Sequence, residues 1–446
     1  MYWSNSLLAA LPRLRTLPLE ALDGPAQLSV AALERAHDFA ADRIASLFGP
    51  AGATSPADAT SAAAGLRMLL LLPVGDRCNL SCRYCYEDPR RVGMGKGTPL
   101  MSVEALHVLM DKVLATVQPP FKIYLHGGEP LLRGLPFFTE LVRRVRRHPW
   151  GDRIGLGVQT NGTLIDDQWA AFFASEGVNV GLSLDGPADI HDRNRRTETG
   201  RGSHARVIKG LELLQRHGVP YGVITVLTST VADQDGAATA VLDYFRGLGV
   251  HNFDVHPSYG LAPAAQTLNV SPRSYARFMI ELFEAWLQQP PQQAVIVRSF
   301  EHFFQGMTGV LADNCLRAGK CLSIIGVAPD GEVLSCVRPF DPVYRFGNLL
   351  QQDLEAVLSS PGFQHFAADE EAGRKLTASC SWSRLCGFGG CPHERLTVDG
   401  CQSPAGRHVH CTCAGGEGGY PAIFSHICRR VEEIVTAAAV SKAAAR

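Results

Sequence analysis

The chain has 446 residues, and at roughly 150 residues per domain this length predicts two or three domains with a large buried core. Apolar residues make up 46% of the chain and charged residues 19%, with a formal net charge of -1 at pH 7. These values exclude a disulfide-stapled miniprotein, a disordered chain and a polycationic nucleic-acid-binding protein.

Residues 1–66 are predicted to form an N-terminal helical extension followed by a linker. They contain one amphipathic segment, Ser29–Leu47, and then a stretch rich in Ala, Ser, Gly and Pro, Gly49–Gly65. Met1–Leu11 lacks the basic and apolar regions of a signal peptide, and no stretch reaches the roughly 18 apolar residues of a membrane helix. We therefore expect a cytoplasmic protein with no membrane partner.

Residues 67–260 alternate short apolar runs with longer amphipathic segments, which is typical of strand–helix units around a parallel sheet. Six units are too few to close an eight-stranded barrel, so the sequence predicts an α/β fold with a partial (β/α)6 barrel of the TIM type. The expected strands are Met68–Val74, Phe121–His126, Ile154–Gln159, Val178–Leu184, Val219–Leu227 and Val250–His256, and the expected helices are Ser102–Val117, Leu135–His148, Ile165–Ser175, His204–His217 and Ala237–Leu248.

Residues 261–314 predict a helical bridge, because Ser271–Gln289 is amphipathic. Residues 315–428 hold ten of the thirteen cysteines and form a cysteine-rich domain. Within it, Leu322–Leu334 is expected to form a hairpin that turns at Pro329–Gly331. Residues 429–446 complete a C-terminal helical tail that starts near Ile423.

Three cysteines, Cys78, Cys82 and Cys85, follow the first strand with CxxxCxxC spacing. Active sites of such barrels lie at this carboxyl end of the strands. A chain without an export signal keeps its thiols reduced, which favours metal or cluster binding over disulfides. Three thiolates leave one iron of a four-iron cluster open, and an open iron can chelate a substrate. The alternative is a zinc site with a distant fourth ligand.

Polar, glycine-containing turns follow the next three strands. They are His126–Pro130, Gln159–Gly162 and Ser183–Pro187. Because the carboxyl ends of parallel strands meet at one rim, we expect these turns beside the cysteine loop, where backbone can approach a ligand closely.

The cysteine triplet and the three turns resemble the radical S-adenosylmethionine (SAM) superfamily over residues 66–260. The resemblance implies that the open iron binds SAM and that cleavage of SAM yields a 5'-deoxyadenosyl radical, which abstracts hydrogen from a carbon. It implies Cys78, Cys82 and Cys85 as the catalytic cluster ligands, and Tyr84, Gly127, Gly128, Glu129, Asn161, Ser183, Asp185 and Arg195 as SAM-binding residues. The alternatives are a helix-start carboxylate for Glu129 and a structural ion pair for Asp185 and Arg195.

The cysteine-rich domain resembles the SPASM extension of that superfamily, and the Gly331-x4-Cys336 spacing is the specific part of the match. The resemblance implies one or two auxiliary four-iron clusters. Thr377 stands where the family usually has a cysteine, so the second cluster lacks an obvious fourth ligand and could keep an open iron or be replaced by zinc. Cys428 is expected to be a buried free thiol. The implied ligands are Cys315, Cys321, Cys336 and Cys391 for the first cluster, and Cys380, Cys386 and one of Cys411 or Cys413 for the second, with Cys401 or the remaining cysteine as its fourth.

The resemblance implies a peptide maturase that forms a carbon–carbon or thioether cross-link in a ribosomal precursor peptide, with a reductase such as a flavodoxin or ferredoxin as partner. Formylglycine-type or other two-electron oxidation of a side chain is the alternative, because residues 159–195 look like anaerobic sulfatase-maturating enzymes. Those enzymes carry an Asp base directly after the cysteine of Gx4C. Val337 stands there in this chain, although Asp341 or His256 could substitute. A non-enzymatic cluster or zinc protein is the remaining hypothesis.

Overall fold

The computed structural model describes residues 65–86, 99–260, 263–289, 295–307, 321–337, 342–380, 382–383, 385–387, 389–396, 403–411 and 418–444. The predicted helix Ser29–Leu47 and the linker after it lie outside the described residues. In the described part, no helix has the length and apolar character needed to cross a membrane.

The barrel strands and helices predicted from the sequence are all present in residues 67–260, which confirms the α/β fold class. The boundaries differ from those predicted by a few residues, as is usual at element ends. The strands are β1 (Met68–Leu71), β3 (Phe121–Leu125), β4 (Ile154–Thr160), β5 (Asn179–Ser183), β7 (Tyr221–Leu227) and β8 (Asn252–Pro257), and the helices are α4 (Val103–Leu114), α5 (Leu135–Arg146), α6 (Asp167–Glu176), α8 (His204–Arg216) and α10 (Ala237–Gly247).

Several short elements at the rim and in the bridge were not predicted, because they are too short to show a hydrophobic period. The rim elements are β2 (Ser81–Cys82), η6 (Pro130–Arg133), α7 (Ala188–Asn194), β6 (Arg195–Arg196) and α9 (Ser229–Ala232), and η7 (Gly151–Arg153) precedes β4. In the bridge, α11 (Pro263–Gln266), β9 (Ile296–Val297) and α13 (Arg298–Met307) were not predicted, whereas α12 (Pro272–Leu287) confirms the helix predicted at Ser271–Gln289.

The cysteine-rich half consists of short strands and two long helices. The elements are η9 (Cys321–Ser323), β10 (Ile324–Val327), β11 (Glu332–Leu334), η10 (Pro342–Tyr344), β12 (Arg345–Asn348), α15 (Leu354–Leu358), α16 (Pro361–Thr377), η11 (Pro392–Glu394), β13 (Arg395–Leu396), β14 (Arg407–His408) and α17 (Gly419–Ala444).

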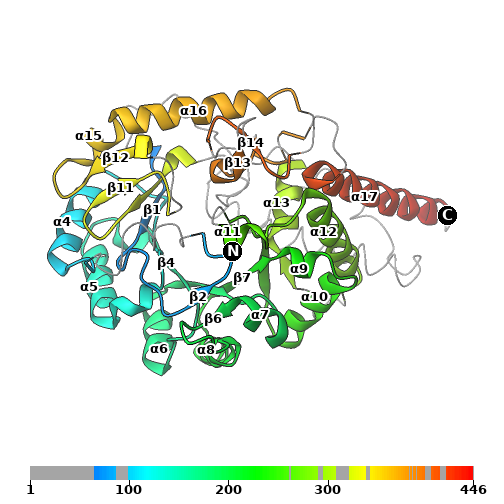
Figure 1. Ribbon diagram of the computed structural model, residues 1–446, viewed down its shortest axis with the longest axis horizontal. Coiled ribbons are helices and arrows are strands. Elements are labelled where there is room, and N and C mark those ends of the chain that lie inside the picture. The colour runs from blue at the N-terminus through cyan, green and yellow to red at the C-terminus, as the bar shows by residue number, and fades with distance from the viewer. Residues whose placement is uncertain are drawn as a thin grey trace.

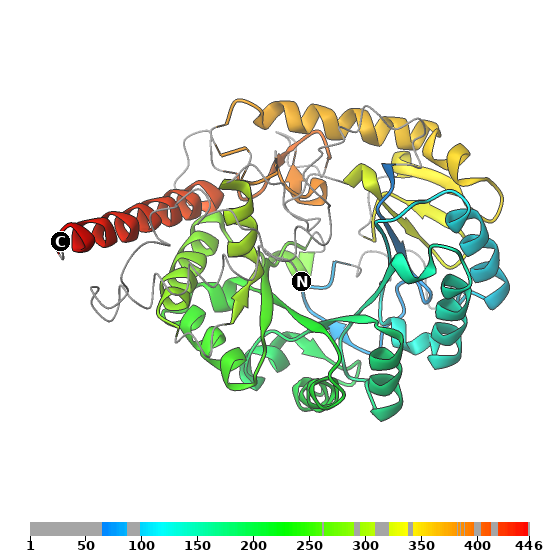
Figure 2. The same cartoon turned by 180° about the vertical axis from the view of Figure 1, so that it is seen from behind.

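One ten-stranded sheet, in the order β12-β11-β10-β1-β3-β4-β5-β7-β8-β9, curves into an open barrel with helices on its outside (Figure 1). The strands from β1 to β8 are parallel neighbours. Helix α16 runs along the open side, and α17 projects away from the ring in both views (Figure 2).

The first hairpin of the cysteine-rich half extends the barrel sheet. Strand β10 pairs with β1 in parallel, with Met68 opposite Ile324, and β11 returns antiparallel to β10. The predicted hairpin is thus confirmed, and Gly331 at its turn has a φ of 85°, a conformation that favours glycine. The sequence did not reveal that this hairpin and the barrel share one sheet.

Strand alternation separates an outer core from a concave inner face. On β3, Phe121, Ile123 and Leu125 belong to the main hydrophobic core beneath the helices. Tyr124, on the opposite face, packs instead against a small second cluster that includes Leu70. The side chains of the inner face are therefore separate from the main core.

Candidate active site

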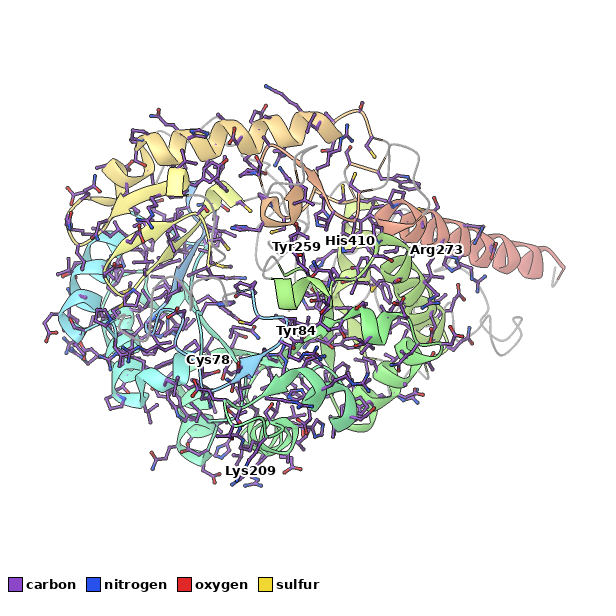
Figure 3. The ribbon with its side chains drawn as sticks, viewed as in Figure 1. Cys78, Tyr84, Lys209, Tyr259, Arg273 and His410 are labelled. Carbon is purple, nitrogen blue, oxygen red and sulfur yellow. The ribbon has the colours of Figure 1, made fainter. Side chains whose placement is uncertain are left out.

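The CxxxCxxC loop runs across the carboxyl end of the barrel strands. Strand β2 within this loop pairs antiparallel with β6, so that Cys82 lies opposite Arg195. All three sulfur-bearing residues are partly exposed, and Figure 3 shows Cys78 and Tyr84 within the ring of strands, whereas Lys209 lies outside it. The structure therefore places the predicted cluster loop where barrel enzymes keep their active sites.

Two glycines allow the turn after β3 to pack directly on this loop. A Cβ atom on Gly127 would lie 2.5 Å from the Gly75 carbonyl oxygen, and one on Gly128 would lie 2.0 Å from the Arg77 carbonyl oxygen. The Gly128 N–H donates to the Gly75 carbonyl oxygen at 2.8 Å. Any side chain at either position would separate the turn from the cysteine loop.

Glu129 ties the same turn to the end of β4. Its side chain is fully buried and accepts hydrogen bonds from the Thr160 hydroxyl at 2.8 Å, the Asn161 N–H at 2.7 Å and the Leu131 N–H at 3.0 Å. Burial raises the pKa of Glu129 to about 7, although these hydrogen bonds oppose the shift. In the structure Glu129 thus braces the rim, and its contact with SAM stays a prediction.

The Cys78 sulfur accepts two N–H groups. The Leu80 N–H lies 3.4 Å from it and the Asn161 side-chain amide lies 3.7 Å from it. The Asn161 side-chain amide also donates to the Asn79 side-chain oxygen at 2.8 Å, and the Thr163 hydroxyl donates to the Asn161 side-chain oxygen at 2.7 Å. Such donors stabilise a thiolate and are one means of tuning the potential of a bound cluster.

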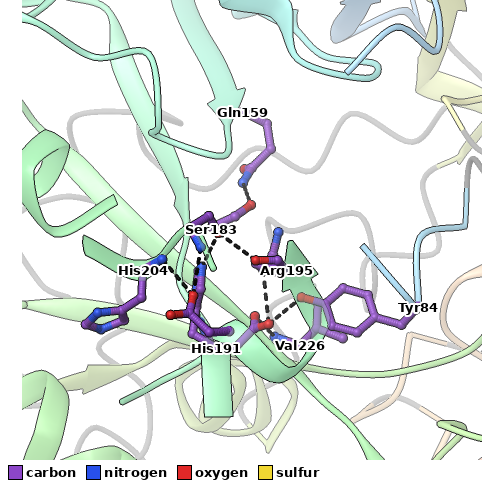
Figure 4. A network of polar contacts seen from close by, with 10 residues as sticks. Tyr84, Gln159, Ser183, His191, Arg195, His204 and Val226 are labelled. Carbon is purple, nitrogen blue, oxygen red and sulfur yellow. Dashed lines mark hydrogen bonds and ion pairs between the residues drawn. The ribbon is translucent and has the colours of Figure 1, made fainter. Parts of the chain in front are cut away.

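The Asp185 carboxylate joins three elements of the rim (Figure 4). One oxygen accepts from the Tyr84 hydroxyl and from Arg195 Nε at 3.0 Å, and the other accepts from the Val226 N–H at 3.0 Å. The Arg195 guanidinium also lies over the Tyr84 ring, 5.3 Å from its centroid. The structural ion pair between Asp185 and Arg195 that the sequence left open is therefore present. The same carboxylate holds Tyr84, which lies between Cys82 and Cys85.

His191 supports this network through both of its ring nitrogens. Its Nδ1 accepts from the Asp185 N–H at 3.3 Å, and its Nε2 contacts the Ser203 hydroxyl at 2.9 Å, which in turn donates to the Arg195 carbonyl oxygen. Burial lowers the pKa of His191 to about 4, so the ring is neutral near pH 7. Both ring nitrogens are used by the protein, which leaves His191 no proton-transfer role.

Ser183 and Gln159 lie on the inner face below the rim, where the Gln159 amide donates to the Ser183 hydroxyl at 3.1 Å. A Cβ atom on Gly181 would lie 2.1 Å from the Gln159 side-chain oxygen. Because Gly181 has no side chain, the side chain of Gln159 can lie across β5. A SAM contact of Ser183 stays a prediction.

In the cysteine-rich half, Arg395 clamps the loop that carries Cys391. Its fully buried guanidinium donates to the carbonyl oxygens of Gly389 at 3.2 Å and Gly390 at 2.9 Å, and it pairs with Glu370 of α16 at 3.2 Å. Burial raises the pKa of Glu370, against the opposing charge of Arg395. The role of Arg395 was not predicted from the sequence, because its carboxylate partner Glu370 is 25 residues away in the chain.

The expected auxiliary ligands are only partly described. Cys321 and Cys391 are buried, and Cys336, Cys380, Cys386 and Cys411 are partly exposed, whereas Cys315, Cys401 and Cys413 lie outside the described residues. Cys428, expected to be a buried thiol, is partly exposed. Within the described ranges no three His, Cys, Asp or Glu side chains group as ligands of a single metal ion. This finding gives no support to the zinc alternative among them, because zinc draws its ligands to one point whereas each cluster cysteine binds a different iron.

Two family models match the chain. Residues 72–240 match the radical SAM superfamily, and residues 319–387 match the iron–sulfur cluster-binding SPASM domain. The chain belongs to the radical SAM superfamily and carries a SPASM domain. The recognition made from the cysteine spacing is thereby confirmed.

Curated relatives and solved structures agree with this assignment. The chain is 28% identical to a serine-type anaerobic sulfatase-maturating enzyme of Klebsiella aerogenes, over 80% of this chain and 84% of that protein. It is 29% identical to a cysteine-type enzyme of Clostridium perfringens, over 72% of this chain and 88% of that protein. The structure of native anSMEcpe with bound AdoMet and Cp18Cys peptide matches with a TM-score of 0.70 at 26% identity and covers 83% of this chain and 98% of that chain.

The radical SAM domain implies SAM and a four-iron cluster, and the SPASM domain implies auxiliary clusters. When bound, SAM and the cluster supply a 5'-deoxyadenosyl radical. The described residues fit these groups: Cys78, Cys82 and Cys85 present their sulfurs from one loop, and the Cys78 sulfur already accepts N–H donors. In the described part of the chain only Nε of Arg195 is hydrogen-bonded, to Asp185, so its two terminal nitrogens can receive a carboxylate.

We expect Asp185→Asn to loosen the cysteine loop. The substitution leaves the buried Arg195 without its counter-charge, which should lower the free energy of unfolding by about 3–5 kcal/mol. Thermal denaturation and iron content of the reconstituted protein measure both effects. Asp243→Asn is the matched control, because Asp243 forms an exposed ion pair with Arg246 at 2.8 Å. Equal losses for the two variants would contradict the role of Asp185.

We expect Glu129→Gln to remove a pH dependence of stability. The pKa of Glu129 in the folded protein, about 7, exceeds its usual 4.5. The contribution of Glu129 to the free energy of unfolding is therefore complete below pH 4.5 and is lost as the pH rises through about 7. The free energy of unfolding of the wild type should therefore fall by about 3 kcal/mol more than that of the variant over this range. Chemical denaturation between about pH 4.5 and 8 measures the difference. Parallel profiles would show that Glu129 keeps an ordinary pKa.

We expect Arg395→Lys to weaken the auxiliary-cluster loop selectively. A lysine cannot reproduce the guanidinium fork, which should destabilise the fold by about 1–3 kcal/mol and reduce auxiliary iron. Iron analysis and electron paramagnetic resonance distinguish the auxiliary signals from the catalytic one. Arg345→Lys, at an exposed ion pair with Glu332, is the control. Loss of the catalytic signal instead would refute a local effect.

Proposed function

We propose that the protein oxidises a peptide or protein substrate by two electrons, beginning with hydrogen abstraction by a SAM-derived radical. The observation that carries this proposal is the position of the SPASM hairpin beside the catalytic loop. Strand β10 pairs with β1, the strand that leads into the CxxxCxxC loop. Val337, directly after Cys336, belongs to one buried cluster with Leu70 and Leu72 of the same barrel face. The residues that lead into the catalytic loop and the predicted auxiliary-cluster ligand Cys336 thus pack against the same apolar cluster. Electron transfer from a substrate radical requires such proximity.

Relatives support a peptide or protein as the substrate. Both curated relatives described above are sulfatase-maturating enzymes, and one of the similar solved structures holds a peptide together with AdoMet. SuiB of Streptococcus suis bound to the precursor peptide SuiA shares the fold, with a TM-score of 0.54 at 14% identity, over 87% of this chain and 92% of that chain. Reducing equivalents from a flavodoxin or ferredoxin are part of the same proposal.

Oxidation of a single side chain, as in formylglycine formation, is the product class that the relatives favour. One observation favours intramolecular cross-linking as a second candidate. Sulfatase-maturating enzymes resemble this chain but place an Asp base where Val337 stands, and Val337 is buried among Leu70, Leu72 and Ile324. A valine cannot accept a proton, so formylglycine chemistry in this chain needs a base elsewhere.

Anaerobic co-expression with two peptides tests the proposal. One is the short peptide encoded beside this gene, and the other carries the Ser or Cys that sulfatases mature. We expect a mass loss of two hydrogens with a stretch that resists fragmentation for a cross-link, or a hydrazide-trapped aldehyde for formylglycine. Tandem mass spectrometry separates these products.

The control variant replaces Cys78, Cys82 and Cys85 with Ala, and should abolish SAM cleavage while auxiliary iron remains bound. Modification by this variant would refute the assignment of the catalytic cluster. An unchanged mass for both peptides with the active wild type would contradict the proposed substrate class.

A further inference from the structure

Strand β8 turns a row of polar side chains toward the inside of the barrel. Phe253 and Val255 belong to the outer core. Because side chains alternate along a strand, Asn252, Asp254 and His256 face the concave side. A buried carboxylate and a histidine therefore stand two residues apart on the face that surrounds the reaction space.

Asp254 and His256 form a hydrogen-bonded pair with a fixed orientation. His256 Nε2 lies 3.3 Å from one oxygen of Asp254. The other oxygen accepts from the Val255 N–H at 3.0 Å and from the Ser299 hydroxyl on α13. Asp254 is 3% exposed, so its carboxylate is held by the protein and not by water.

The charge of Asp254 selects one tautomer of His256. Burial alone would raise the pKa of the Asp254 carboxyl, but the hydrogen bond from His256 and the nearby His302 and Arg298 hold that pKa well below its usual range. An ionised carboxylate only accepts hydrogen bonds, so Nε2 carries the proton in the neutral ring, and Nδ1 is then the nitrogen with the lone pair. The same logic orients the imidazole in Asp–His pairs of hydrolases.

The Asp254–His256 pair lies close to the rim formed by the carboxyl ends of the barrel strands. His256 is the register partner of Val226, and the Val226 N–H holds the Asp185 carboxylate that anchors Tyr84. The β5 and β8 strands are two neighbours apart, which places the His256 backbone about 10 Å from that of Asp185 across the sheet. The side chain of His256 is 22% exposed, in contrast to the fully buried His191. His256 thus combines an oriented ring, an available nitrogen and access to the rim.

We propose that His256, oriented by Asp254, is the base that takes up the proton released by the substrate during oxidation. This inference rests on the proposed function and applies to either product class. The substrate gives one hydrogen atom to the 5'-deoxyadenosyl radical, one electron to an auxiliary four-iron cluster and one proton to Nδ1 of His256. The proton then passes to solvent. The base missing at Val337 is thereby supplied from the opposite side of the barrel face.

The test uses the reconstituted full-length protein and the synthetic form of the peptide that the wild type modifies. In His256→Gln and His256→Ala, 5'-deoxyadenosine should still form, whereas modified peptide per 5'-deoxyadenosine should fall by about 100-fold. Added imidazole should restore part of the ratio in His256→Ala. Asp254→Asn should lower the ratio by about tenfold, because the ring loses its orientation.

His217→Gln is the matched control. His217 also pairs with an aspartate, Asp167 at 3.2 Å, but on the outside of the barrel, so the ratio should remain that of the wild type. An unchanged ratio in both His256 variants would overturn the inference while leaving the proposed function intact.

A second measurement needs no peptide and therefore separates this inference from the proposed function. Diethyl pyrocarbonate acylates an imidazole nitrogen that has a free lone pair. Mass spectrometry of the treated wild type should find the label on His256, with no label on the fully buried His191. Absence of label on His256 would overturn the inference even if both peptides are modified.

Discussion

The geometry of the rim depends on one buried carboxylate. Asp185 at the end of β5 binds the tyrosine of the cysteine loop, the arginine of β6 and the backbone of β7. A charge taken out of water is tolerated only when it is paired and hydrogen-bonded, so each partner is also constrained by the cost of leaving the carboxylate unsatisfied. In the described part of the loop after β1, residues 72–86, the regular structure is the two-residue strand β2, and the contacts of Asp185 with Tyr84 and Arg195 help to position Cys82 and Cys85.

The opposite end of the same loop is positioned by backbone packing instead of charge. Gly127 and Gly128 bring the turn after β3 against residues 75–77, and Glu129 anchors that turn to β4. The Asn161 N–H that binds Glu129 belongs to the same residue whose side chain donates to Cys78. One hydrogen-bonded chain therefore runs from the buried Glu129 carboxylate to the predicted cluster ligand Cys78, and it joins the turns after β3 and β4.

The sequence predicted the parts that local periodicity encodes. Apolar runs gave the six barrel strands, and the turn chemistry of Pro329–Gly331 gave the β10–β11 hairpin. The pairing of β10 with β1 joins segments about 250 residues apart, and no local pattern encodes it. Asp254 and His256 lie on or beside a correctly predicted strand, so their common face followed from alternation, but the hydrogen bond from Ser299 that fixes Asp254 is a tertiary contact. Assignments at Cys315, Cys401 and Cys413 stay predictions, since those residues lie outside the described ranges.

The two sides of the barrel face differ in chemistry, and this difference bears on the substrate. Beside β1 the face is apolar, with Leu70, Leu72, Ile324 and Val337 in one buried cluster. Beside β8 it carries the Asp254–His256 pair. A substrate side chain that packs against the apolar cluster and also delivers a proton to His256 must reach from β1 to β8. An aromatic ring, or a residue presented on an extended peptide, suits this better than a small polar molecule. In the proposed mechanism Val337 therefore has two effects: it leaves proton acceptance to His256 across the barrel, and it adds an apolar side chain to the face beside β1.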